Sequence, residues 1–324
     1  MKIIEPAVIE LQEDNPYKLV ESVGRTCYKS ENSITDTSYI KFVSNCISRQ
    51  HFAMLEHGHV YFQIFDLGDK HYTTLLAVAG TDYVDFETIP LIDEAEVCRK
   101  LGTHWIFAVS LSHLYHPQYA HISLFEAVRN LAEFTYLPGG THLALNSPID
   151  EDKLNVIRHP ECVGVPCDIQ LLCPESIKLI APQLLHHSMR FTCDRGVSHE
   201  LVRHRCAVAQ ESTRYCNYHK SRFGNAITVI KPVNIQYDTP AFHAWEQTCL
   251  CAERCYMAIL EEGLTPQDAR SVLPNSLKTE VVLTMSIRRW QHFINLRSLG
   301  TTGAPHPDMK VVADKVANIL QIGK

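Results

Sequence analysis

The stretch HELVRHRCAVAQESTRYCNY, residues 199–218, concentrates side chains that bind anions. Its relevant polar residues are Arg203, His204, Arg205, Gln210, Ser212 and Arg214. Guanidinium, amide and hydroxyl groups together suit a phosphate or the edge of a pyrimidine. From these residues alone two interpretations stay open. The stretch is either a solvated surface with ordinary ion pairs or a binding site for an anion.

The distribution of charge along the chain bears on this choice. Residues 186–222 hold seven Lys/Arg against three Asp/Glu, and residues 270–297 hold five against Glu280 alone. Each segment is therefore a local +4 on a chain whose formal net charge is −6. An arginine is costly to desolvate without a partner. Two basic segments on an acidic chain favour a small, discrete anion site over a general nucleic-acid surface.

The second basic segment includes SIRRWQHFINLRS, which we expect to be helical from residue 287 to about residue 297. Arg288 and His292 are four residues apart and so share one helical face. Arg297 lies at the end of this helix. A cation there also offsets the helix dipole, and that alternative stays open for Arg297. Arg270 lies upstream, in DARSVLPNS.

Capping residues and periodicity predict the elements that position these side chains. Helices are expected over residues 16–27, 37–48, 123–134 and 240–262, with a shorter one after Thr265. Strands are expected over residues 59–65, 189–193 and 278–286, with a further one over 71–80. Asn15 and Thr239 are expected caps, each followed by proline, and Gly263 is an expected stop. Helices and strands without regular alternation predict an α+β fold, and no linker divides residues 1–324, so we expect one domain.

Finer expectations concern the basic stretch itself. We expect a short helix to carry HELVRHR after the strand at 189–193. Beyond Ala209 an extended chain would put Gln210, Ser212 and Arg214 on one face. The pair His186-His187 is expected on a helix face, without a catalytic role.

Composition limits the classes of protein. With 324 residues, 45% of them hydrophobic, the chain can bury a substantial core. No apolar run reaches about 18 residues and the start does not resemble a signal peptide, so we expect a cytoplasmic protein outside the membrane. The twelve cysteines, such as Cys249, Cys251 and Cys255 in apolar helical contexts, are expected to be reduced thiols.

Two kinds of ligand site are not indicated by the sequence. Cys162, Cys167 and Cys173 are more widely spaced than a common zinc grip, and no second close pair follows, so we expect no metal site. No glycine-rich phosphate loop is present either.

Four elements, in order, resemble the flavin-dependent thymidylate synthases. The family's His-x-x-x-x-Glu-His is matched by HFAMLEH, residues 51–57, and its Arg-His-Arg and Ser-x-Arg-Tyr by residues 203–205 and 212–215. An Ala-Arg-x-Val-Leu-Pro element is matched by residues 269–274. A helix ending in Leu-Arg with a later histidine is matched by HFINLR and His306. The resemblance covers roughly residues 15–65 and 186–320.

The resemblance implies an α+β homotetramer whose active sites form between subunits around FAD. Such an enzyme methylates dUMP to dTMP, with 5,10-methylenetetrahydrofolate as the one-carbon donor and NADPH as the reductant. It uses no cysteine nucleophile, and the resemblance implies neither a nucleic-acid nor a membrane partner.

Site residues follow from the resemblance position by position. The flavin would lie against His51, Ala53, Glu56, Arg203, His204, Arg205, Ser286, Arg288 and His292. The nucleotide would be held by Glu200, Arg203, Gln210, Ser212, Arg214, Arg270 and Arg297. Arg297 would face the pyrimidine carbonyl and N3, where it stabilises negative charge as the ring is activated. Arg297 and Ser212 are the candidate catalytic residues.

The chain departs from the family at several points. Six residues, 206–211, separate Arg-His-Arg from the serine, where seven are usual. If the spacer is extended, the missing residue shifts the serine by about 3.3 Å. Gln210 stands where glutamate is common, and Ser286 where asparagine is common. The linker SLGTTGAP before His306 is longer than usual, which leaves the role of that histidine open. Residues 66–185 form a long insertion without a role implied by the family.

These departures keep two other hypotheses in view. The shortened spacer and Gln210 suit a family member acting on a different pyrimidine nucleotide. A protein with a degenerated centre would bind flavin or nucleotide without catalysis.

Overall fold

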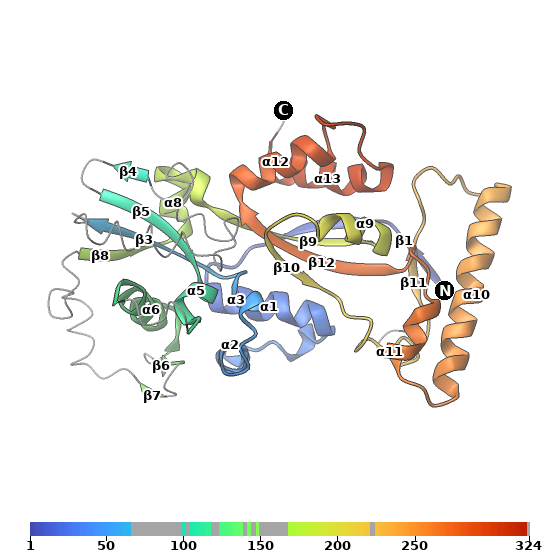
Figure 1. The fold of residues 1–324 in the computed structure, drawn as a ribbon, viewed down its shortest axis with the longest axis horizontal. Coiled ribbons are helices and arrows are strands. Elements are labelled where there is room, and N and C mark those ends of the chain that lie inside the picture. The colour runs from blue at the N-terminus through green and yellow to red at the C-terminus, as the bar shows by residue number, and fades with distance from the viewer. Residues whose placement is uncertain are drawn as a thin grey trace.

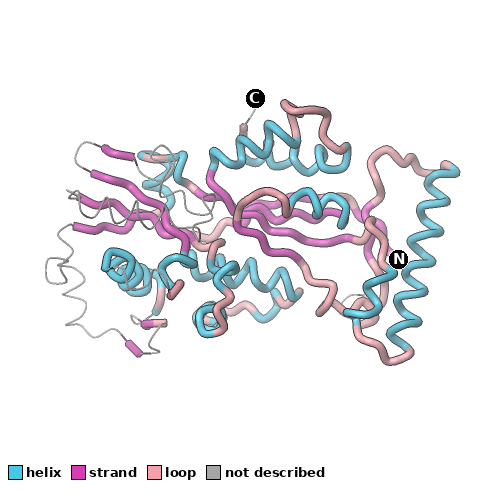
Figure 2. Tube along the Cα trace, viewed as in Figure 1, coloured by secondary structure: helices cyan, strands magenta, loops and turns pink. Residues whose placement is uncertain are grey.

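The computed structural model describes residues 1–65, 99–101, 104–117, 123–138, 141–143, 147–148, 168–220 and 224–322. In these residues the chain forms two four-stranded antiparallel sheets and two two-stranded pairings (Figure 1). Figure 2 shows the strands of both large sheets in magenta with cyan helices packed around them. The expected mixture of helices and antiparallel sheet is confirmed.

The central sheet has the strand order β10–β12–β9–β2. These strands are Ala207–Gln210 (β10), Lys278–Ser286 (β12), His186–Asp194 (β9) and Ala7–Leu11 (β2). Helices α9 (Arg195–Leu201), α12 (Ile287–Arg297) and α13 (Pro307–Leu320) cover one face, and α1 (Pro16–Tyr28) lies on the other (Figure 1). Leu283 of β12 packs with the first group and Val282 packs with α1. Because both faces are covered, the run from residue 281 to 286 is buried, which explains its nearly continuous apolar sequence.

The second sheet has the order β4–β5–β3–β8. Its strands are Arg99–Leu101 (β4), His104–Ser110 (β5), His59–Phe65 (β3) and Asp168–Leu172 (β8), so three of them come from the stretch 66–185. Helices α5 (Leu111–Tyr115), α6 (Ser123–Tyr136) and α8 (Pro174–Ile180) accompany it, with a 3₁₀ turn η4 (Pro182–Leu184) and a small pairing of β6 (Thr141–His142) with β7 (Ser147–Pro148).

The core of the second sheet is shared with the first helices of the chain. Phe62, Phe107 and Phe125 belong to one cluster with Tyr17 of α1 and Val43 of α2 (Ser38–Ser48). Leu55 of α3 (Phe52–Leu55) joins the same cluster. The described part of residues 66–185 therefore extends β3 into a sheet and packs against α1–α3.

A third group of elements forms one end of the molecule (Figure 1). The parallel pair β1 (Lys2–Ile4) and β11 (Thr228–Ile230) lies beside the long helix α10 (Pro240–Glu261), which is followed by α11 (Pro266–Ala269) and the 3₁₀ turn η6 (Arg270–Val272). A further turn, η1 (Glu31–Ser33), follows α1. Val229, Cys249 and Tyr256 share a buried cluster.

The expected helices and their caps are confirmed. Asn15 accepts hydrogen bonds from the backbone N–H groups of Tyr17 and Lys18, and Thr239 accepts one from Phe242. The capping box at Thr265 is present, and Gly263 has the positive φ, +85°, that glycine tolerates. Helices α2, α6 and α12 and strands β3, β9 and β12 also match their expected positions. The expected strand over residues 71–80 lies outside the described residues.

Three local predictions were wrong. Helix α9 ends at Leu201, so Arg203-His204-Arg205 lie in the turn that follows it. Strand β10 ends at Gln210 and the chain turns at residues 213–215, so Gln210, Ser212 and Arg214 do not share one extended face. His186 and His187 begin strand β9 because they pair with Ser286 and Met285 of β12.

Cys249, Cys251 and Cys255 of α10 were all expected in apolar surroundings, and this is confirmed for only one of them. Cys249 is buried against the core, while Cys251 and Cys255 are exposed. Separately, none of the helices within the described residues is long and apolar enough to cross a bilayer.

Candidate anion-binding site

A basic cavity lies where β12 passes into α12 and where the chain leaves α9. Its volume is about 570 Å³. Its lining residues are Arg203, His204, Arg205, Met285, Arg288, Arg289, His292, Leu296 and Arg297. Five of the nine are arginines and two are histidines, with no carboxylate among them. A cavity with this lining attracts anions and offers fixed, fork-shaped donors for phosphate oxygens. We call it the arginine cavity.

Short local elements hold the Arg-His-Arg turn in place. Asp194 caps α9 by accepting the backbone N–H of Val197 at 2.9 Å. After the helix ends, the backbone N–H of His204 donates to the carbonyl of Leu201 at 3.1 Å. The side chain of Arg289 donates to the carbonyl of Arg205 at 2.8 Å. Helix α12 is thereby tied to the turn that faces it across the cavity.

The predicted catalytic Arg297 is already bound to two other predicted site residues. Its Nη1 lies 2.6 Å from Oε2 of Glu200, and its Nε donates to Nε2 of His204 at 3.2 Å. A guanidinium only donates, so Nε2 of His204 must be the accepting nitrogen. Burial, then Arg297 and His292, lower the pKa of His204 to about 4, so the ring is neutral at pH 7. The ring also meets Phe293 edge-on, with centroids 4.9 Å apart.

Ser286 is placed where β12 ends and α12 begins. Its side chain is 3% exposed, and its Oγ is buried without a hydrogen-bond partner among the described residues. A buried hydroxyl without a partner is unusual. Arg288 and His292, on the first turns of α12, line the arginine cavity, whereas Ser286 is not among its lining residues.

The other residues predicted to bind flavin lie elsewhere. His51 and Ala53 line a separate, mostly apolar cavity of about 540 Å³, whose lining also includes Tyr28, Phe42 and Phe52. Glu56 is the C-cap of α3. Within one chain, the residues predicted for one flavin thus line two separate cavities, except Glu56 and Ser286, which line neither.

The residues predicted to bind dUMP are not all at the arginine cavity either. Glu200, Arg203 and Arg297 belong to the arginine cavity or contact its lining. Ser212 follows β10 and donates its backbone N–H to the carbonyl of Cys27 at 3.0 Å. Nε of Arg214 donates to Oε1 of Gln267 at 2.9 Å. Arg214 and Arg270 are both exposed.

The side chain of Gln210 makes its hydrogen bonds away from Ser212, Arg214 and Arg270. Its Nε2 donates to Oγ of Ser198 at 3.0 Å and lies 3.4 Å from Oγ1 of Thr279. The amide therefore connects the start of the Ser212 loop to α9.

Sequence reasoning missed two residues that shape the site. Arg289 lines the arginine cavity and binds the Arg205 carbonyl, and its spacing of three residues from His292 was a usable signal. Glu211 was also missed. It is 3% exposed, lies beside Ser212, and is paired with Nζ of Lys278 at 2.8 Å. No sequence signal links Glu211 with Lys278, which is 67 positions away.

Among the described residues no group of three or more His, Cys, Asp or Glu side chains is arranged to hold a metal ion. Cys173 is exposed, whereas Cys162 and Cys167 lie outside the residues that the structure describes.

The part of the chain that forms the arginine cavity matches a known protein family. Residues 183–322 match the family model described as thymidylate synthase complementing protein. This part of the chain is similar to that family. It contains every residue that lines the arginine cavity, together with Ser212, Arg214 and Arg270.

Individual relatives carry the name flavin-dependent thymidylate synthase. The protein from Pyrococcus horikoshii is 32% identical over 138 residues, which is 41% of this chain and 56% of that relative. The protein from Geobacter sulfurreducens is 32% identical over 118 residues, covering 35% and 49%. The chain thus spans about half the length of the curated relatives it matches.

A solved structure, the UMP/dUMP methylase PolB from Streptomyces cacaoi bound with 5-Br dUMP, aligns over 98% of this chain and 91% of its own. The identity is 11% and the TM-score 0.39.

Proposed function

We propose that the protein is a flavin-dependent thymidylate synthase, which methylates dUMP to dTMP with 5,10-methylenetetrahydrofolate and NADPH. The observation that carries the proposal is the arginine cavity, lined by five arginines and two histidines without a carboxylate. The reaction uses two phosphate-bearing ligands, the nucleotide and FAD, and such a lining suits them. The cavity also lies in the segment that matches the family model.

The residues proposed to hold FAD include Arg203, His204, Arg205, Ser286, Arg288 and His292, with His51, Ala53 and Glu56 from the α3 region. FAD, when bound, supplies the transfer of reducing equivalents from NADPH. The arginines bind and orient its diphosphate, and the buried Oγ of Ser286 has hydrogen-bonding capacity available for it. The neutral ring of His204 adds no charge to this side of the cavity at pH 7.

For the nucleotide we propose Glu200, Arg203, Gln210, Ser212, Arg214, Arg270 and Arg297. Arg297 would stabilise negative charge on the pyrimidine as it develops, because a fixed guanidinium in a cavity needs little reorganisation. Its bonds to Glu200 and His204 hold the planar group in one orientation before substrate arrives. Ser212 Oγ accepts the backbone N–H of Arg214 at 3.4 Å and leaves its own hydrogen available to a ligand.

We further propose a homotetramer with active sites between subunits. The support is that His51 and Ala53 line one cavity and Arg203, His204 and Arg205 another. Residues of one site on separate faces come together if two copies face each other. We also propose that the chain acts as one domain, since the second sheet shares its core with α1–α3. We propose in addition that the protein is cytoplasmic.

A second candidate is methylation of a different pyrimidine nucleotide. Gln210 favours it, because the position offers an amide bound to Ser198 instead of a carboxylate. A neutral amide changes which hydroxyl or ring edge is preferred nearby.

The deciding experiment measures dTMP formation by the full chain, anaerobically, with FAD, NADPH, methylenetetrahydrofolate and dUMP. We expect product that disappears when FAD is removed and returns when it is restored. The same mixture with UMP or dCMP tests the second candidate. Folded protein that retains flavin yet methylates none of the three nucleotides would contradict both.

A further inference from the structure

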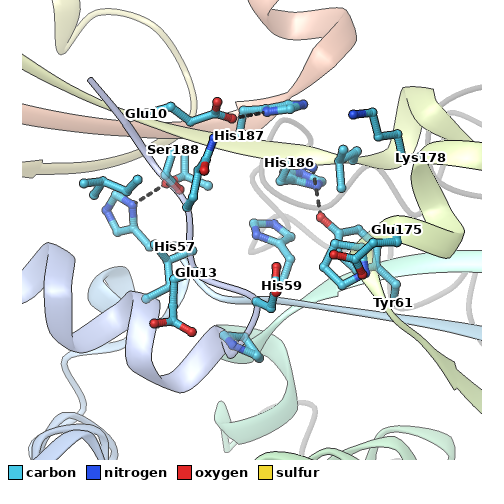
Figure 3. A pocket seen from close by; sticks show the side chains of 18 residues that line it. Glu10, Glu13, His57, His59, Tyr61, Glu175, Lys178, His186, His187 and Ser188 are labelled. Atoms are coloured by element: carbon cyan, nitrogen blue, oxygen red, sulfur yellow. Dashed lines mark hydrogen bonds and ion pairs between the residues drawn. The ribbon is translucent and has the colours of Figure 1, made fainter. Parts of the chain in front are cut away.

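A second polar cavity, of about 530 Å³, lies between the two large sheets. It is bordered by the loop from β2 to α1, the first residues of β3 and β9, and α8 (Figure 3). Four of its lining residues are histidines, His57, His59, His186 and His187. It shares no lining residue with the arginine cavity. We call it the histidine cavity.

The inner wall of this cavity offers hydrogen-bond acceptors. Nδ1 of His186 lies 2.9 Å from the carbonyl of Leu184, and since a carbonyl only accepts, Nδ1 carries the hydrogen. Nε2 of His186 is therefore a lone-pair acceptor. His59 stacks on the same ring with centroids 3.6 Å apart and an interplanar angle of 14°. Figure 3 shows the two rings facing each other in the middle of the cavity.

These imidazoles are neutral at pH 7. Burial lowers the pKa of His57 to about 3 and that of His59 to about 4, and it lowers the pKa of His186 well below its ordinary value. His57 is fully buried, and its Nε2, like Nδ1 of His59, lacks a well-formed hydrogen bond among the described residues. The inner wall thus contributes polar nitrogen atoms without positive charge.

The mouth of the cavity is acidic. Its lining contains four carboxylates, Glu10, Glu13, Asp14 and Glu175, against one amine, Lys178, which gives a charge of −3. Glu10 is bonded to Nδ1 of His187 at 2.6 Å, and protonation of that histidine would leave −2. Either value attracts cations.

Apolar side chains complete the lining. Leu11, Leu19 and Leu185 lie among these polar groups, with Pro16 and Pro174. A hydrated metal ion gains nothing from such contacts, and among the described residues no three ligands converge on one point. Two stacked rings also cannot both direct a lone pair at a single ion.

We propose that the histidine cavity binds an aliphatic amine, a diamine or polyamine whose ammonium groups meet the carboxylates and imidazole nitrogens. Its methylene segments would contact the leucine and proline side chains. The uncharged, nitrogen-lined inner wall, the negative mouth and the apolar contacts together fit this class of ligand. The site is independent of the proposed synthase activity, because none of its residues is assigned to flavin or nucleotide.

The test is calorimetric titration of the full chain with spermidine. We expect one molecule bound per chain. The double variant Glu13→Gln/Glu175→Gln should weaken binding by between about threefold and thirtyfold, as expected for two exposed ion pairs. The matched control is Glu261→Gln/Glu262→Gln, which makes the same charge change at two exposed positions where α10 ends. Helix α10 lies at the opposite end of the molecule from α8 (Figure 1), and this control should leave the affinity unchanged.

Two further measurements distinguish amine binding from attraction to general surface charge and from metal binding. Tetramethylammonium carries the charge without N–H donors and should not compete with spermidine. The variant His186→Phe keeps an aromatic ring but removes the Nε2 acceptor, and it should weaken binding about tenfold or more while cooperative unfolding is retained. Equal loss in the α10 control would mean attraction to general surface charge and would overturn the proposal. Stoichiometric Zn²⁺ binding without spermidine binding, or no binding of either, would overturn it as well.

Discussion

The guanidinium of Arg297 is bound to the carboxylate of Glu200 at 2.6 Å, although the two residues are 97 positions apart. The same guanidinium donates to His204, so one side chain joins the end of α12 to the turn after α9. If Arg297 stabilises negative charge on the pyrimidine, these two bonds orient it for that role before any ligand is present.

Replacing Arg297 with alanine should therefore reduce turnover more than it reduces flavin retention. We expect kcat to fall about 10²- to 10³-fold, the usual effect of losing one fixed donor to a developing charge. FAD content, measured by absorbance after gel filtration, should change little. Arg203→Ala is the comparison, since Arg203 is proposed to contact both ligands and its loss should lower both quantities. Equal, mild effects of the two variants would contradict the assignment.

Acidification should destabilise the protein before its carboxylates titrate. Burial lowers the pKa of His57 to about 3 and those of His59 and His204 to about 4, against an unfolded value of about 6.5. The folded state resists protonation, so the stability is fully present above pH 6.5 and is lost as pH falls towards 4. Each such histidine contributes up to about 1.4 kcal/mol per pH unit in this window.

Urea unfolding at pH values from 8 to 4, followed by tryptophan fluorescence, measures this loss. Trp290 is fully buried and reports the transition. His57→Asn should flatten the pH dependence, whereas the same substitution at the exposed His219 should not alter it. A free energy of unfolding that is constant from pH 6.5 to 4.5 would contradict the assigned protonation states.

Thiol reactivity should follow the burial of each cysteine. Burial raises the pKa of Cys27 and Cys46 to about 11, so few thiolates form at pH 8, and both side chains are buried. Cys251 and Cys255 are exposed on α10. Among the described cysteines, brief alkylation at pH 8, mapped by mass spectrometry of peptides, should label the exposed Cys173, Cys251 and Cys255 first. Cys27 and Cys46 should react only after denaturation, and early labelling of Cys46 would contradict the packing of α2.

Elements with local signals were predictable from the sequence. Helices α1, α10 and α11 carry capping residues and prolines at their starts, and these act within a few residues of the helix end. Strand β12 is a run of β-branched and apolar residues that suits burial on both faces. The two basic segments were also visible as local charge, although their meeting in one cavity depends on how the strands pair.

The wrong predictions came from pairings between distant segments. A helix continuing through Arg205 would leave no room for Ala207 to pair with Thr284, so the chain leaves the helix after Leu201. His186 joins β9 because Ser286 is its partner, a relationship absent from the local sequence LHHS. In the same way, β5 and β8 are ordered on β3 by contacts that no short window contains.

The buried pair of Glu211 and Lys278 should be the most sensitive point of the loop that carries Ser212. Glu211 is 3% exposed, and its carboxylate lies 2.8 Å from Lys278, which also contacts Glu280 at 2.7 Å. Burial alone would lower the pKa of Lys278, but Glu211 and Glu280 reverse this and raise it, so the amine stays charged. Lys278→Met would leave Glu211 buried and unpaired, at a cost of about 3–5 kcal/mol in the free energy of unfolding.

The matched control for this pair is Lys310→Met on α13. Lys310 pairs with Asp314 at the same 2.8 Å, but both side chains are nearly half exposed. An exposed pair contributes about 0–1 kcal/mol, so this variant should be almost neutral in urea unfolding. Glu211→Gln combined with Lys278→Met should recover part of the loss, because it removes the unpaired charge. Equal destabilisation by Lys278→Met and Lys310→Met would show that Glu211 is solvated and does not fix the Ser212 loop.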